Sequence, residues 1–148
     1  MDFTPADPDF DARVRDSFAR QAVMATLGAR ILGIAPGAVD LELAYRADLT
    51  QQHGYLHAGI VTTLLDSACG YAAFTLMPAD ATVLSVEFKT NLLAPAEGEK
   101  LVAHARVLKA GRTLTVCEAR GVMLQGGREK AVAHMVATMM ALHGKADR

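Results

Sequence analysis

Tryptophan is absent from this sequence of 148 residues, and the other aromatic residues are only five phenylalanines and three tyrosines. The core must therefore be built mainly from alanine, valine, leucine and methionine. Long apolar runs are also missing, because Asp, Arg, His or Gly interrupts each run before the ~18 residues that a membrane-spanning helix needs. We expect no transmembrane helix and no membrane partner.

The chain also lacks an excess of charge of one sign. Its 15 lysines and arginines stand against 16 aspartates and glutamates, and no basic block is present. Because nonspecific binding to phosphates requires clustered positive charge, nucleic acid is not an expected partner. The acidic first residues, MDFTPADPDFDARVRDS, lack the charged-then-apolar order of a secretory signal, so we expect a cytoplasmic protein.

Cysteine is scarce, and both cysteines stand among apolar residues. Neither Cys69 nor Cys117 belongs to a CxxC pattern or has a histidine at metal-ligand spacing. This pattern predicts two small buried side chains, and neither a disulfide nor a zinc site. We therefore expect no bound metal.

The first third of the chain shows a change from helical to strand patterns. Apolar residues at near-helical spacing predict an amphipathic helix over 7–27, continuous or broken in two, with Asp7 as its cap and Gly28 at its end. Residues 29–45 then predict two short strands joined by a turn at 35–37, where Pro and Gly favour the turn.

The segment QQHGYLHAGIVTTLLDSACGYAA leads into a helix predicted over 57–77, which is apolar around most of its circumference and should be buried. Four later runs contain β-branched or alternating residues and are separated by breaks with Gly or Pro. They predict strands over 83–93, 100–109, 112–124 and 129–142. The last run also contains many Ala and Met residues, which favour helix.

One apolar helix followed by a series of antiparallel strands favours an α+β fold in which a curved sheet wraps around the helix. The length predicts a single domain over 1–148, with residues 1–17 as an N-terminal helical extension. In the strand predicted over 83–93, we expect the apolar residues to face the core and the alternating polar residues to face solvent or an interface. The apolar set is Leu84, Val86 and Phe88, and the polar set is Ser85, Glu87 and Lys89.

Three segments, LHAGIVTTLLD, VLSVEFKTNLLAPA and VLKAGRTL, resemble those of the hotdog-fold acyl-CoA thioesterases. The resemblance covers roughly residues 18–142 and points to the phenylacetate-degradation-type branch of the 4-hydroxybenzoyl-CoA thioesterase superfamily and its animal relatives. It implies a hotdog fold and an enzyme that hydrolyses the thioester of an acyl-CoA. It also implies no cofactor, because coenzyme A is part of the substrate.

The resemblance further implies which residues form the site. The family pattern is Asn or Gln, then His-Gly-Gly, then an acidic residue nine positions after the histidine. The acidic residue is Asp66 here, and the chain departs from the pattern by Ala58 in place of the first glycine and by Gln51 where the phenylacetate-type enzymes more often have Asn. The implied site residues are Gln51, His57, Ala58, Gly59, Asp66 and Ser85, the last matching a serine that assists catalysis in the animal relatives.

The chemistry explains why these positions matter. A thioester carbonyl becomes an oxyanion when it is attacked, and the free amides at a helix N-terminus, here those of Ala58 and Gly59, stabilise such a charge. Asp66 lies roughly 13 Å from the His57 end at 1.5 Å per residue, which is too far to act on the same carbonyl. A homodimer that shares its active sites is therefore expected, as in the family, and a homotetramer is expected to form from it.

Several alternatives remain at this point. Asp66 acts as a general base or as a nucleophile, or is a structural carboxylate satisfied by Thr62, Thr63 or a facing backbone amide. Arg112, at a hairpin turn, is a weak candidate for the phosphates of coenzyme A. A mostly aliphatic lining by the two helices would suit a medium-chain or aryl acyl group. The rival functions are a non-catalytic acyl-CoA-binding or sensing protein and a hotdog enoyl-CoA hydratase or dehydratase.

Overall fold

The computed structural model describes residues 3–145 and 147. The helices are α1 (Phe10–Arg20), α2 (Ala22–Leu27) and α3 (Ala58–Phe74), with a short 3₁₀ helix, η1 (Ala47–Leu49). The strands are β1 (Arg30–Ala35), β2 (Ala38–Ala44), β3 (Ala81–Leu92), β4 (Lys100–Ala110), β5 (Leu114–Gln125) and β6 (Arg128–His143). The last run is thus a strand, as its alternation predicts, despite its Ala and Met content.

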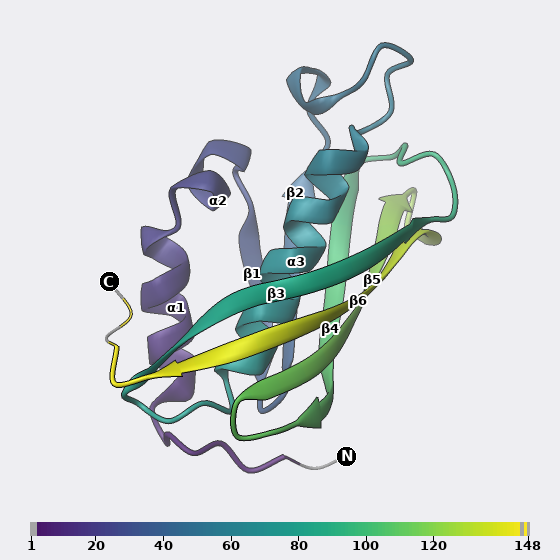
Figure 1. The fold of residues 1–148 in the computed structure, drawn as a ribbon. Helices are drawn as coiled ribbons and strands as arrows, with labels where there is room; N and C mark the ends of the chain where they lie inside the picture. The colour runs from purple at the N-terminus through teal and green to yellow at the C-terminus, as the bar shows by residue number, and fades with distance from the viewer. Residues whose placement is uncertain (1–2, 146, 148) are drawn as a thin grey trace.

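The six strands form one antiparallel sheet in the order β1-β2-β4-β5-β6-β3. The sheet curls around α3, with β3 and β6 passing on one side of the helix and β1 and β2 on the other (Figure 1). This confirms the expected α+β arrangement. No helix among residues 3–145 is both long enough and apolar enough to cross a membrane.

Small side chains let the sheet approach the helix closely. On α3, Leu64, Leu65 and Ala68 are fully buried, and on β6 the inward positions include Ala133 and Ala137, also fully buried. Both cysteines lie in this core as free thiols, as expected, and burial raises the pKa of Cys117 to about 12. A core of this kind depends on close packing more than on large aromatic groups.

The N-terminal helix begins later than the sequence pattern predicts. Asp7 is not its cap: it accepts a hydrogen bond from the N–H of Asp9 at 3.0 Å and pairs with Arg13 at 2.9 Å. Arg13 in turn donates to the carbonyls of Phe74 and Met77, at 3.0 and 2.7 Å. A cation is favourable at this C-terminal end of α3, so the pair fastens α1 to the central helix.

The predicted helix over 7–27 is broken in two at Gln21, whose backbone is extended (φ −76°, ψ 95°). The second piece, α2, ends at Gly28 in the left-handed conformation (φ 73°), which glycine adopts without strain. The break matters for the site, because it turns the side chain of Gln21 towards α3, where Ser67 contacts it.

Strand β3 lies at the edge of the sheet and contradicts one expectation. Leu84, Val86 and Phe88 do not enter the core of the chain but are 50%, 53% and 44% exposed. The register with β6 shifts between Ser85 and Glu87, which leaves Val86 as a bulge and reverses the alternation beyond it. Ser85, which precedes the shift, pairs with the fully buried Met139 and bonds to Asp66, so it faces α3, although the simple alternation predicts the opposite.

Candidate active site

The sheet leaves one stripe of α3 only partly covered. Thr62, Asp66 and Gly70 are partly buried, whereas Leu65 and Ser67, next to Asp66, are buried. Positions four residues apart lie on the same face of a helix, so these three form a single line along it. The carboxylate of Asp66 is therefore not in the core but faces a cavity beside it.

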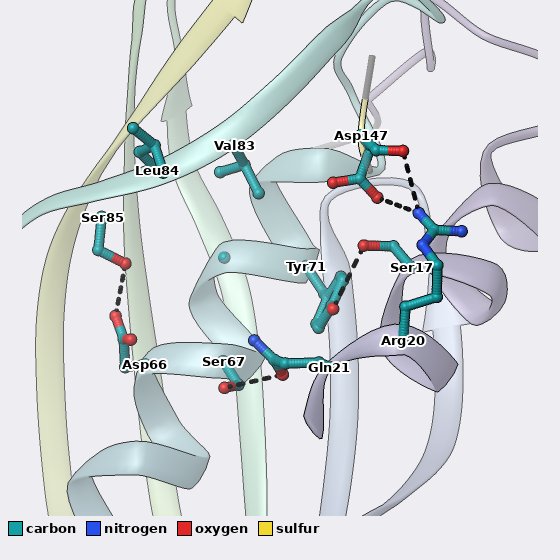
Figure 2. Close-up of a pocket in the computed structure, with 11 residues that line it drawn as sticks. Ser17, Arg20, Gln21, Asp66, Ser67, Tyr71, Val83, Leu84, Ser85 and Asp147 are labelled. Atoms are coloured by element: carbon teal, nitrogen blue, oxygen red, sulfur yellow. Dashed lines mark hydrogen bonds and ion pairs between the residues drawn. The ribbon is translucent and has the colours of Figure 1, made fainter. Parts of the chain in front are cut away.

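Asp66 has one hydrogen-bond partner from the neighbouring strand. The hydroxyl of Ser85 on β3 donates to Asp66 Oδ1 at 2.7 Å (Figure 2). Burial raises the pKa of Asp66 above its ordinary value, and the Ser85 hydrogen bond opposes that rise. Thr63 instead donates to the carbonyl of Gly59, and among the described residues neither Thr62 nor Thr63 donates a hydrogen bond to the carboxylate.

The cavity next to Asp66 has a volume of about 330 Å³. Its walls come from α1, α3, β3 and Asp147, and they are mainly polar, which corrects the expectation of a mostly aliphatic lining. Hydrogen bonds join the walls: Ser17 to Tyr71 at 3.4 Å and Ser67 to Gln21 at 3.5 Å (Figure 2). The lining residues are Ser17, Arg20, Gln21, Asp66, Ser67, Gly70, Tyr71, Val83, Leu84, Ser85 and Asp147.

The helix N-terminus uses one of its amides internally. His57 is the N-cap of α3, and its Nδ1 accepts the N–H of Gly59 at 2.9 Å. The N–H of Ala58 has no acceptor in the part of the chain that the structure describes. Ala58 also has no positive φ, so alanine is unstrained at the position of the first motif glycine.

Gln51 lies near this helix end. Its backbone N–H donates to the carbonyl of Tyr55 at 2.9 Å, and its side-chain oxygen accepts the N–H of His53. Gln51 and Ala58 line a second cavity of about 530 Å³, together with Leu92 and its neighbours. The structure thus brings Gln51 together with Ala58, at the end of α3 that carries the unpaired amide.

Within one chain the two cavities are separate. The first is lined by residues at the start of β3, including Ser85, and the second by residues at its end, including Leu92. Seven residues of strand span about 23 Å at ~3.3 Å per residue. Arg112 lines neither cavity, and its carbonyl oxygen lies 3.1 Å from the ring of His143.

Of the cavity residues, only Asp66 and Ser85 belong to the sequence-based set, and those it lacks include Gln21, Ser67, Gly70 and Tyr71. Gly70 and Ser67 have a detectable signal, because they lie four and one positions after Asp66 on a predicted helix. Gln21 has none, because its placement depends on how α1 packs. Among residues 3–145 and 147, no group of three or more His, Cys, Asp or Glu side chains is arranged to hold a metal ion.

Comparisons with known proteins bear on the same residues. The sequence profile of the thioesterase superfamily matches residues 53–130, which include all of α3, β3, β4 and β5. A putative esterase of Halobacterium salinarum is 31% identical over 121 residues, 78% of this chain and 80% of the relative. Human acyl-coenzyme A thioesterase 13 is 34% identical over 85 residues, 57% of this chain and 60% of the relative.

Solved structures show the same architecture. A crystal structure of a thioesterase family protein from Silicibacter pomeroyi is 61% identical, has a TM-score of 0.90 and covers 91% of this chain and 99% of that one. The PaaI protein of the phenylacetic acid degradation operon of E. coli is 20% identical, with a TM-score of 0.85, and covers 95% of this chain and 99% of that one. The latter similarity concerns the fold alone.

Proposed function

This chain belongs to the thioesterase superfamily and is a thioester hydrolase with the hotdog fold, and we propose that its substrate is an acyl-CoA, which it hydrolyses to a free acid and coenzyme A. The observation that carries the proposal is the partly buried carboxylate of Asp66, bonded to Ser85 and facing a cavity. Neither bound metal nor cofactor is required for this reaction.

In the proposed mechanism, Asp66 is the general base. Its raised pKa makes the carboxylate a stronger acceptor for the proton of a water molecule, and Ser85 fixes its orientation. The hydroxide that results attacks the thioester carbonyl carbon. The carbon–sulfur bond then breaks, the electron pair leaves with sulfur, and the coenzyme A thiolate takes up the proton that Asp66 accepted from the water.

The negative charge that forms on the carbonyl oxygen needs a donor. We assign this role to the N–H of Ala58, which lies at the positive end of α3 and has no acceptor among the described residues. The N–H of Gly59 contributes only if His57 releases it. Gln51, in the same cavity, is placed to hold the thioester or the water through its amide.

Two subunits are needed to bring Asp66 and Ala58 together. Strand β3 is an edge strand of 12 residues that exposes Leu84, Val86, Phe88 and Leu92, and Leu93 just after its end is exposed as well. Long apolar edge strands are rarely left uncovered, because their free backbone groups pair with other strands. We propose that β3 pairs with β3 of a second copy and forms a homodimer.

The geometry of such a pairing merges the two cavities. If two β3 strands run antiparallel about a two-fold axis near Phe88, the residue that faces Ser85 is Leu92 of the partner subunit, because 85 and 92 are nearly equidistant from 88. The cavity of Asp66 in one protomer then adjoins the Ala58 cavity of the partner. Each of the two sites receives its base from one chain and its oxyanion donor from the other.

The cavity beside Asp66 also limits the acyl group. Its volume of about 330 Å³ is near the lower end of small-molecule sites, ~300–1,000 Å³, and its polar walls disfavour a long alkyl chain. We therefore favour an aryl or short-to-medium acyl group. Cytoplasmic localisation, assembly of dimers into a tetramer and contact of Arg112 with coenzyme A remain predictions.

The test is thiol release from acetyl-, hexanoyl-, palmitoyl- and phenylacetyl-CoA by the wild type and by Asp66→Asn. We expect the variant to lose about a hundredfold or more in kcat, since a positioned base contributes ~10²–10⁴. Binding without thiol release by the wild type would favour a non-catalytic acyl-CoA-binding protein. Hydration of 2-enoyl-CoA would favour a hydratase, and transfer of heavy oxygen from labelled water into Asp66 would identify a nucleophile.

A further inference from the structure

Gly70 occupies the middle of α3, where glycine destabilises a helix relative to alanine. Its backbone does not require glycine, because its φ is not in the left-handed region. Packing does not require it either: a Cβ added at Gly70 would meet no heavy atom within 4 Å. By contrast, a Cβ at Gly121 would approach Leu65 Cδ1 to 3.2 Å, so packing explains that glycine.

The empty space at Gly70 opens into the cavity of the catalytic carboxylate. Gly70 lies one helical turn after Asp66 on the same face, about 6 Å further along the axis. Both residues line the cavity of about 330 Å³, whose lining also includes Gln21 at the break between α1 and α2. A side chain at position 70 would therefore reduce the space next to Asp66 without disturbing the core.

We propose that Gly70 determines acyl specificity: its missing side chain makes room for a wide acyl group, such as an aryl ring, one helical turn from the carboxylate. The inference rests on the proposed thioesterase function and adds the position of the bound acyl group. The acyl end is assigned to this cavity because the cavity, at about 330 Å³, is too small for the whole of coenzyme A. Glycine at position 70 makes α3 less stable than alanine would, and it leaves this space open.

The test compares Gly70→Ala and Gly70→Leu with Gly33→Leu as a matched control. Gly33 lies on β1, where an added Cβ would also meet no atom within 4 Å, and it does not line the cavity. The kcat/KM is measured for acetyl-CoA and phenylacetyl-CoA. Dissociation constants for both ligands are measured by calorimetry in the Asp66→Asn background, in which turnover is suppressed.

We expect Gly70→Leu to lower the ratio of kcat/KM for phenylacetyl-CoA over acetyl-CoA by about tenfold or more, mainly through KM, since pocket contacts of this size discriminate by ~10–200-fold. Gly70→Ala should lower the ratio less, and its melting temperature should not fall, which separates lost space from lost folding. Gly33→Leu should leave the ratio unchanged. The dissociation constants should change in the same order.

The outcomes separate this inference from the proposed function. If Gly70→Leu leaves the ratio unchanged while Asp66→Asn abolishes thiol release, the role of Gly70 is wrong and the thioesterase function stands. If the wild type releases no thiol but binds phenylacetyl-CoA in a manner that depends on position 70, the cavity assignment stands and the function is wrong. Absence of both binding and thiol release would contradict both.

Discussion

Proline in place of Ala58 should remove the proposed oxyanion donor while the helix remains folded. Ala58 is the first residue of α3, a position at which proline is tolerated because its N–H takes no part in the helix. The preceding residue, His57, has φ −59° and ψ 139°, the extended conformation that a residue before proline favours. Ala58 is exposed, so the proline ring has space.

The expected effect is large. Loss of one oxyanion donor lowers kcat by ~10²–10³, equivalent to about 2.7–4 kcal/mol of barrier. Because the Gly59 N–H is bonded to His57, Ala58 supplies the principal free amide, and the Ala58→Pro effect should fall in this range. Steady-state thiol release gives kcat, and circular dichroism with light scattering checks the fold and the oligomeric state.

Ala58→Gly is the matched control for this variant, because it changes the same side chain but keeps the N–H. We expect it to retain kcat within a few-fold of the wild type. A folded Ala58→Pro enzyme of unchanged oligomeric state that hydrolyses its substrate at the wild-type rate would refute the assignment of the donor.

Three further predictions follow from the site. Burial raises the pKa of Asp66, so above the ordinary pKa of Asp the ionised carboxylate destabilises the folded state. Asp66→Asn should therefore have a higher melting temperature than the wild type at pH 7. The two melting temperatures should converge as the pH falls towards ~4. The value of kcat/KM should rise with pH as Asp66 loses its proton. Ser85→Ala should move the midpoint of this rise to higher pH, because the variant removes a hydrogen bond that lowers the pKa of Asp66. An unmoved midpoint would count against Asp66 as the base. Val86→Lys should shift the protein to monomer by light scattering and abolish activity, whereas full activity in a stable monomer would contradict the shared site.

Patterns that depend on local physics predicted most of the fold. The apolar circumference of the segment now seen as α3, the glycine at position 28 and the turn before β2 each reflect a constraint within a few neighbouring residues. The order of one buried helix and four later strands then restricts the arrangement to a wrapped sheet. The carboxylate at Asp66 is likewise visible as a single charge on an apolar helix.

Features that depend on distant contacts could not be predicted. The alternation in β3 indicated a core-facing set, but Leu84 and Phe88 are exposed on a strand at the edge of the sheet, and a bulge at Val86 shifts its register. A bulge has no clear sequence signature, and apolar residues on an exposed edge strand resemble core residues in sequence. The polar lining of the cavity depends on the docking of α1, which places Gln21 beside Ser67.

The helix N-terminus shows a similar limit. Sequence spacing identifies both Ala58 and Gly59 as amide donors, since each occupies the first turn of α3. The conformation of the His57 ring decides which amide is free, and its hydrogen bond to the Gly59 N–H leaves the Ala58 N–H as the free one. Side-chain capping of this kind is a property of one rotamer and is not encoded in the motif itself.

The central claim is that each active site takes Asp66 from one subunit and Ala58 from the other. Its most direct test is complementation between two inactive variants. Asp66→Asn and Ala58→Pro are mixed in equal amounts, unfolded together and refolded, and thiol release is compared with each variant refolded alone. A shared site predicts recovery of about a quarter of the wild-type activity, because half of the dimers are mixed and each of these contains one intact site of two. If each site lies within a single chain, the mixture remains as inactive as its components, and the account is contradicted.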